Sequence, residues 1–330
     1  TGKIMGGGPS QWAAEEHARQ GLPIYATPDA ARSFNDDLEA VKGMGIRLVS
    51  EDEARQLSGD VQRFELRDFD FQLISATFYQ FGVSLDDLSA VAVAVFDHGN
   101  SPPYYSDRKF RFDYLDERIR AENRLSAFAY RAEQVPPKMT RLAAVVETVR
   151  RLDAEFLRDL PLMIMDTAPA AVLGATLDPK VISRERKLVV NVGNFHTLAF
   201  RLGPSGIEGL FEHHTGLLNQ ASLEDLLKKL AEGSLTNDSV FADHGHGALI
   251  YFPEPLPLEG GEYGVVVAGP RRALLRGSSL RPYFSAPFGD MMIAGCCGLL
   301  AAMTDVMPEF RETILDSFSG SGGRPPWELV

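Results

Sequence analysis

Histidines beside acidic residues are the most reactive feature of this sequence. Five of its seven histidines lie in polar or glycine-rich stretches: His98, His213, His214, His244 and His246. Imidazoles and carboxylates together suit Zn²⁺, Mn²⁺ or Fe²⁺. Neither H-E-x-x-H nor another established metal spacing is present. A metal-dependent enzyme is therefore one hypothesis, and its candidate ligands are Asp97, Asp243, His244 and His246.

Asp97 and His98 follow the apolar stretch L-S-A-V-A-V-A-V-F, and Asp166 follows the apolar stretch M-I-M. Each position is the end of a predicted strand. The small residues after Asp166 predict a tightly packed helix over Ala168 to Ala175. Such a carboxylate either caps a helix or turn, or acts as a base that positions water or a nucleophile. The candidate catalytic residues are Asp166, Asp97 and His98.

Two glycine-containing turns offer backbone amides to an anion. Gly193 and Asn194 follow the apolar strand predicted at Leu188 to Val192, and both types tolerate positive φ in a tight hairpin. Gly269 follows G-V-V-V-A and precedes arginines that can stack on a base or fork onto a phosphate. The predicted nucleotide-binding residues are Gly193, Asn194, Phe195, His196, Thr197, Gly269, Pro270, Arg271 and Arg272.

Alternating strands and helices must position these residues. Leu88 to Phe96 predicts a buried strand, and Pro28 to Met44 predicts a helix. This alternation indicates an α/β sheet, whose ligands gather beyond the carboxyl ends of the strands. Asn100 to Tyr114 is expected to be a loop, in which cations such as Arg111 pair with nearby acids or capture a substrate phosphate.

The composition narrows the classes of protein and partner. A net charge of −12 argues against general binding to nucleic acid or to anionic membranes. No apolar run approaches the roughly 20 residues of a membrane helix, and no secretory signal is recognised. A cytoplasmic location is expected, and the oligomeric state stays open.

The order strand, acid, small-residue helix, strand, glycine hairpin, strand resembles the superfamily of actin, sugar kinases and heat-shock chaperone ATPases. M-D-T-A-P-A-A-V-L-G is similar to the chaperones' E-P-T-A-A-A-L helix, and N-V-G-N-F-H-T to their phosphate loop D-x-G-G-G-T. Asn191 replaces the acid, Asn194 and Phe195 replace glycines, and Thr197 is displaced by one residue. The resemblance implies a two-lobed, ribonuclease H-like ATPase architecture that binds Mg-ATP or another nucleotide between its lobes.

The same resemblance implies how the chain is divided. Residues 1–186 are expected to form the remainder of a first α/β lobe, and residues 187–316 a second lobe with a closing helix near 289–303. Residues 317–330 are expected to be a flexible tail. The superfamily's first phosphate hairpin, D-x-G-x-G-T, does not occur in the sequence. The first strands of lobe one are therefore expected to be missing from it.

From Ile4 to about Leu300 the chain more closely resembles an uncharacterised prokaryotic family labelled "putative pyruvate formate-lyase activating protein". The phrases that carry this resemblance are M-G-G-G-P-S, F-D-H-G, S-D-R-K-F-R-F, F-E-H-H-T-G, D-H-G-H-G-A and P-F-G-D-M-M. A radical activating enzyme needs spaced thiolates for its iron–sulfur cluster. The only cysteines, Cys296 and Cys297, are adjacent. The sequence therefore predicts no such cluster and no activity of that kind.

Nucleotide binding is the favoured function, with ATP hydrolysis or phosphoryl transfer as the reaction and a small-molecule nucleotide as the partner. A metal-dependent enzyme that holds a transition metal is the first alternative. A degenerate relative, kept as a binding module without catalysis, is the second.

Overall fold

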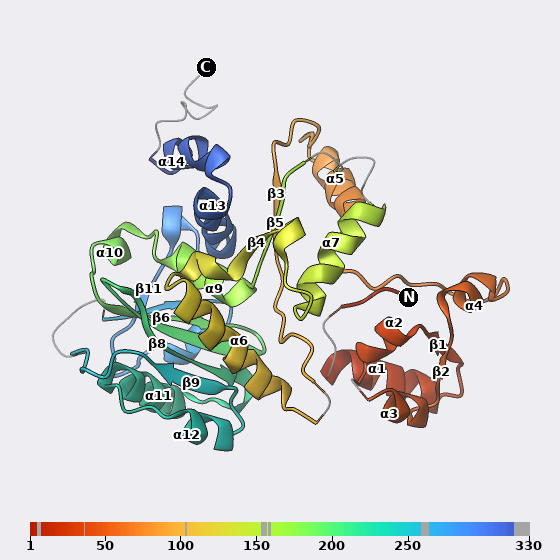
Figure 1. Cartoon of the computed structure of the whole chain (residues 1–330), viewed down its shortest axis with the longest axis horizontal. Helices are drawn as coiled ribbons and strands as arrows, with labels where there is room; N and C mark the ends of the chain where they lie inside the picture. Colours follow the sequence, from red (N-terminus) through yellow and green to blue (C-terminus); the bar gives the residue numbers. More distant parts are fainter. Residues whose placement is uncertain are drawn as a thin grey trace. The chain divides into compact units, whose positions relative to one another are not determined.

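The computed structural model describes residues 1–4, 8–35, 37–102, 104–152, 157, 160–258 and 264–319 (Figure 1). Helices and sheets of mixed strand direction confirm the α/β class. The chain divides into two compact units. The first comprises Thr1–Ala90, Val95–Asp97 and Met139–Leu160, and the second comprises Val91–Ala94, His98–Lys138 and Pro161–Val330. No helix in the described ranges is long and apolar enough to cross a membrane.

The first unit contains a short parallel sheet and a small apolar core. Its described elements are α1 (Gly8–Arg19), β1 (Ile24–Ala26), α2 (Pro28–Arg32), α3 (Leu38–Gly43), β2 (Ile46–Leu48), α4 (Glu51–Gln56), α5 (Phe71–Gln80) and α7 (Thr140–Leu152). Strands β1 and β2 pair with Ile24 opposite Ile46. The single helix predicted over Pro28 to Met44 is wrong, because Asp37 accepts a hydrogen bond from the Glu39 N–H and starts α3 there.

The smaller sheet of the second unit has the strand order β3-β5-β4. These strands span Val91–Ala94, Leu162–Met165 and Ala129–Arg131; β3 runs parallel to β5 and β4 runs antiparallel to it. Strand β3 is shorter than the predicted Leu88 to Phe96. Helix α6 (Asp107–Ala121) occupies much of the expected loop, and η1 (Leu125–Phe128) follows it.

A six-stranded mixed sheet forms the centre of the second unit, in the order β11-β10-β6-β7-β8-β9. Its strands are β6 (Lys187–Val192), β7 (His196–Gly203), β8 (Gly206–His214), β9 (Gly247–Ile250), β10 (Val265–Ala268) and β11 (Tyr283–Phe284). The pairs β6–β7, β7–β8 and β8–β9 are antiparallel, whereas β10 runs parallel to β6. The predicted boundary between the lobes, at Lys187, coincides with the start of β6 and lies inside the second unit. The division into two lobes at this residue stays a prediction.

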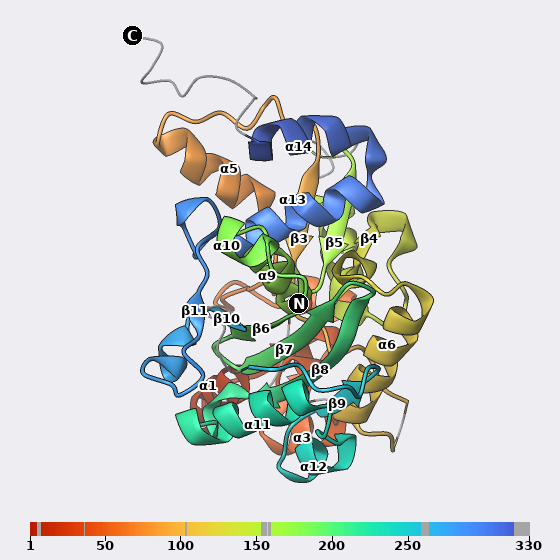
Figure 2. The ribbon, with the colours of Figure 1, turned by 90° about the vertical axis from the view of Figure 1, so that its left-hand side faces the viewer.

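The two faces of this sheet have different coverings. Figures 1 and 2 show α11 (Gln220–Glu232) and α12 (Asn237–Ala242) on one side, and α6 and α9 (Thr167–Ala175) on the other. Ala199 and Phe211 point toward the α11 side, where they join a fully apolar core. Because strand side chains alternate, Leu198 and its partner Glu212 point to the opposite face, toward α6 and α9. The pleat therefore buries a carboxylate against those helices.

Small residues allow α9 to cross α13 (Ala294–Val306) at backbone distance. A Cβ on Gly174 would lie 1.7 Å from the Ala294 carbonyl oxygen, and one on Gly298 would lie 1.8 Å from that of Ala170. The tight packing predicted for the helix after Asp166 is thus present. This crossing fixes the helix that begins beside Asp166.

The end of the second unit differs from the prediction in two places. Helix α13 begins at Ala294 rather than near residue 289, because Phe288 (φ 54°) and Gly289 (φ 87°) have left-handed backbone. Residues 317–319, expected in the tail, continue α14 (Arg311–Ser319). The rest of that predicted tail, residues 320–330, lies outside the described residues.

Candidate metal centre

Four polar side chains of the second unit converge beside the six-stranded sheet. His98 lies four residues beyond β3, His196 begins β7, Glu212 lies within β8, and His246 directly precedes β9. We call His98, His196, Glu212 and His246 the His/Glu group. Each offers one ligand atom, and these atoms all lie within 4.8 Å of one another.

Strand register explains why three of these residues meet. Leu198 is paired with Glu212, so His196, two residues earlier on β7, shares the face of Glu212. Glu212 is also opposite Gly247 at the start of β9. The N–H of His246 donates to the Glu212 carbonyl oxygen at 2.9 Å, which places its ring beside the same strand.

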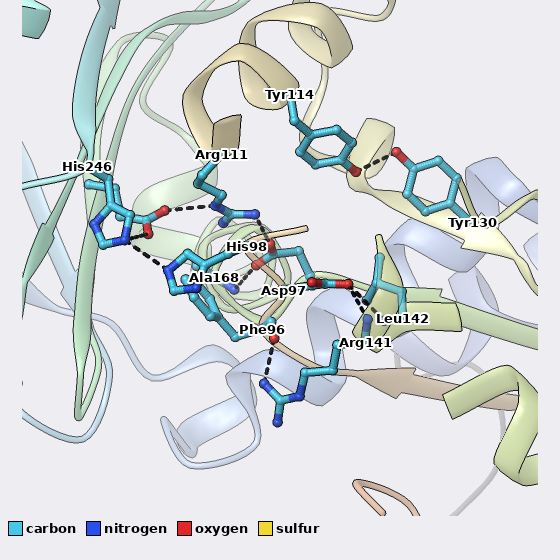
Figure 3. A network of polar contacts seen from close by, with 12 residues as sticks. Phe96, Asp97, His98, Arg111, Tyr114, Tyr130, Arg141, Leu142, Ala168 and His246 are labelled. Atoms are coloured by element: carbon cyan, nitrogen blue, oxygen red, sulfur yellow. Dashed lines mark hydrogen bonds and ion pairs between the residues drawn. The ribbon is translucent and has the colours of Figure 1, made fainter. Parts of the chain in front are cut away.

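The spacing of the ring nitrogens suits a shared ion. His98 Nε2 and His246 Nε2 are 2.9 Å apart (Figure 3). Two nitrogens bound at right angles to one ion, with bonds of about 2.05 Å, lie roughly 2.9 Å apart. Opposite ligands of one ion lie about 4.1 Å apart by the same bond lengths, so the group needs only small side-chain shifts to close on a metal.

A buried arginine separates two buried carboxylates behind the group. Arg111 Nε donates to Glu212 Oε2 at 3.2 Å, and Arg111 Nη1 donates to Asp166 Oδ2. The side chains of Arg111, Glu212 and Asp166 are at most 1% exposed. With all three ionised, they leave one net negative charge in a dry environment, which a cation would balance.

Burial keeps the three imidazoles of the group neutral. It lowers the pKa of His98 well below its usual range, although the charge of Glu212 opposes this. It lowers the pKa of His196 to about 4. It also lowers the pKa of His246, and neighbouring His196 acts in the same direction. Neutral imidazole is the form that binds a metal.

Two atoms of the group have unused hydrogen-bonding capacity. Glu212 Oε1 and His246 Nδ1 are buried, and neither has a hydrogen-bond partner in the described part of the chain. Glu212 Oε1 instead lies 3.7 Å from His246 Nε2. Buried polar atoms are normally satisfied, so an exception of this kind is expected where an ion or water binds.

The predicted catalytic residues lie in three different environments. Asp97 belongs to the first unit, where its Oδ2 accepts the N–H groups of Arg141 (2.8 Å) and Leu142 (2.9 Å) at the start of α7. Asp166 caps α9 by accepting the Ala168 N–H at 3.0 Å, and it also pairs with Arg111. Burial raises the pKa of Asp166, and the Arg111 charge opposes that shift. Of the three, only His98 belongs to the His/Glu group.

The residues of the D-H-G-H-G segment lie in different environments. His246 is buried in the group, whereas Asp243 and His244 are exposed after α12. His244 has φ 63°, so the backbone turns between the two histidines. The backbone oxygen of Asp243 lies 2.9 Å from the Nε2 of buried His213.

The two turns predicted to bind a nucleotide lie side by side. Strands β6 and β10 are parallel neighbours, and the Arg271 N–H donates to the Val192 carbonyl oxygen at 2.9 Å. Gly269 has φ 97°, and a Cβ there would lie 2.5 Å from that oxygen. Gly193 and Asn194, whose residue types tolerate positive φ, do not adopt it. Gly193 is needed instead for close approach, because its Cβ would lie 2.6 Å from the His196 oxygen.

The other residues of these turns have separate positions. Asn194, Phe195, Pro270 and Arg271 are exposed, and Arg272 is half-buried. Thr197 is buried, with its hydroxyl 2.9 Å from that of Thr215. His196, predicted to face phosphates, belongs to the His/Glu group.

Glu212 is the member of the group that the sequence analysis missed. It lies in the phrase G-L-F-E-H-H, where a carboxylate interrupts an otherwise apolar strand. A charge in a buried strand needs a partner, and that signal would have identified Glu212.

The fold and the site thus define an α/β protein with a candidate metal centre. A family model described as "Putative pyruvate format-lyase activating enzyme (DUF1786)" matches residues 5–274, and the chain belongs to this family. None of the curated proteins or solved structures compared with the chain matches it. The matched residues contain no cysteine, because Cys296 and Cys297 follow them. They therefore offer no thiolate to an iron–sulfur cluster.

Proposed function

We propose that the protein is a metal-dependent enzyme whose His/Glu group binds one divalent transition-metal ion. The convergence of three imidazoles and one carboxylate within 4.8 Å is the observation that carries the proposal. The buried Glu212 carboxylate supports it, because a cation bound beside its unpartnered Oε1 would offset the cost of that burial.

The ligand set favours Fe²⁺ or Mn²⁺ as the catalytic ion. Four protein ligands complete a tetrahedral zinc site, whereas an octahedral ion keeps two positions for water and substrate. His98 and His196 are only partly buried, so their side of the group is more exposed than the side of Glu212 and His246. An ion there would polarise a carbonyl or phosphoryl oxygen, or lower the pKa of a bound water. The proposed reaction class is Lewis-acid catalysis at such an oxygen.

Metal analysis of matched histidine variants tests the proposal. Protein purified without chelator should contain about one transition-metal ion per chain, because the described residues contain one such His/Glu group. His246→Ala should lose the metal, because it removes a buried ligand. His244→Ala is the matched control: it comes from the same segment, is exposed, and should retain the metal.

A second variant keeps this test informative if His246→Ala does not fold. His98 is only partly buried, so His98→Ala is expected to fold even if His246→Ala does not. Equal metal content in wild type, His98→Ala and His246→Ala would refute the metal centre. Wild-type protein that takes up no metal after dialysis against Fe²⁺, Mn²⁺ or Zn²⁺ would refute it as well.

Nucleotide binding is a second candidate, favoured by the adjacency of the Gly193 and Gly269 turns. The element order behind the actin-like resemblance is also present: β5, Asp166, α9, β6, the Gly193 turn and β7. This candidate function includes the proposal of a two-lobed ATPase architecture, with the second lobe beginning at Lys187. Arg111 and the cap on α9 already occupy both carboxylate oxygens of Asp166, which weighs against a basic role for it.

Calorimetric titration with Mg-ATP and Mg-ADP separates the two candidates. Binding that is weakened by Gly269→Ala and unchanged by His246→Ala would favour the nucleotide site. No heat at millimolar ligand would refute it. A protein that binds neither metal nor nucleotide would instead be a degenerate binding module.

A further inference from the structure

Arg111 in α6 connects two carboxylates that have different roles. Its Nε donates to Glu212 Oε2 at 3.2 Å, and its Nη1 donates to Asp166 Oδ2. Asp166 Oδ1 in turn accepts the Ala168 N–H at 3.0 Å. A hydrogen-bonded chain therefore runs from the backbone of α9 through Asp166 and Arg111 to Glu212. All three of these side chains are buried.

The two oxygens of Glu212 face different partners. Oε2 is held by Arg111, whereas Oε1 lies 3.7 Å from His246 Nε2 and accepts no hydrogen bond from the described residues. We infer that Arg111 is a positioning residue that fixes Glu212 as a one-oxygen metal ligand, and that Asp166 positions Arg111. This inference rests on the proposed metal centre.

The guanidinium is suited to this role for two reasons. Its planar fork reaches both carboxylates at once, whereas a lysine ammonium is a point charge with less directional hydrogen bonding. By occupying Oε2 it also prevents Glu212 from chelating an ion through both oxygens. Outer partners of this kind typically contribute about 10–100-fold to metal affinity.

Cobalt binding to an arginine variant measures this positioning. Co²⁺ is the probe, because its visible absorption reports coordination number and its dissociation constant is obtained by competition with a chelator. Arg111→Met should weaken Co²⁺ binding by about 10–100-fold. It should also change the visible spectrum, because the released Glu212 can bind through both oxygens. Arg111→Lys should recover part of the affinity.

A second buried arginine supplies the control. Arg201 is also fully buried in this unit, and its Nε donates to Glu208 Oε2 at 3.0 Å, but it is not part of the chain that reaches the His/Glu group. Arg201→Met should therefore leave the Co²⁺ spectrum and affinity unchanged even if it lowers stability. This result distinguishes positioning of the ligand from a general need for buried ion pairs.

The possible outcomes separate this inference from the proposal beneath it. Arg111→Met protein with the wild-type affinity and spectrum would overturn the inference and leave the metal centre intact. Wild-type protein that binds no Co²⁺ would refute both. If Arg111→Met does not fold, Asp166→Asn decides, because asparagine can still cap α9 but loses the charge that faces Arg111. An unchanged spectrum and affinity in that variant would overturn the inference.

Discussion

Replacing Glu212 by glutamine tests whether this residue is a metal ligand or only a partner for Arg111. Glutamine has nearly the same size and can still accept the hydrogen bond from Arg111 Nε. It removes one negative charge. Arg111 and Asp166 then remain as a neutral pair, so no buried charge is left uncompensated.

The expected stability change in the absence of metal is therefore small. Breaking a buried ion pair usually costs about 3–5 kcal/mol, because one charge is left alone. Arg111 keeps Asp166 as its partner in Glu212→Gln, so a loss below about 1 kcal/mol is expected, the value of one exchanged hydrogen bond. If Glu212 mainly balances Arg111, the larger cost should appear instead.

Adding metal should widen the stability difference between the two proteins. At an ion concentration of 1,000 times the dissociation constant, wild type gains about 4 kcal/mol. That gain raises the unfolding midpoint by roughly 8–16 °C for a unit of 150–250 residues. Glu212→Gln should show little of this rise. Thermal unfolding followed by circular dichroism, with chelator and then with Co²⁺ or Mn²⁺, measures both effects.

Two results would refute this reasoning. The first is a loss of 3 kcal/mol or more for Glu212→Gln in chelator, which would make the residue a structural ion-pair partner. The second is an equal rise of the midpoint on adding metal to both proteins, which would remove Glu212 from the ligand set.

Two further predictions concern the helices of the second unit. Gly174→Ala should destabilise by about 1–3 kcal/mol through overpacking, because its Cβ would lie 1.7 Å from the Ala294 oxygen, whereas Gly295→Ala, with open space, should be neutral or stabilising. Equal midpoints in chemical denaturation would contradict this. Hydrogen bonds from the Ser279 side chain, and next from Ser278, lower the pKa of Glu224 to about 2. Glu224 therefore stabilises the fold above about pH 4.5, and this contribution is lost as the pH falls toward 2. Thermal midpoints of Glu224→Gln should fall less than those of wild type over that range, and parallel curves would count against the assignment.

The sequence could predict the features that depend on residues close together in the chain. Apolar runs identified β5 and β6, because a strand buried on both faces needs no distant information to be recognised. Asp166 was predicted as a possible cap of the helix after it, and it caps α9. The small residues of that helix indicated tight packing before the partner helix was known. Each of these features depends on residues within a few positions of one another.

Only the tertiary structure decided which polar residues meet. His98 and His246 are 148 positions apart, and their nitrogens lie 2.9 Å from each other. The neighbours Asp97 and His98 belong to different units, and His244 is exposed although His246 is buried. These outcomes depend on the register of β7, β8 and β9 and on the sign of one backbone angle, because a shift of one residue turns every strand side chain to the other face. Residue types therefore indicated a metal site, and strand pairing brought together His196, Glu212 and His246, three of the four candidate ligands.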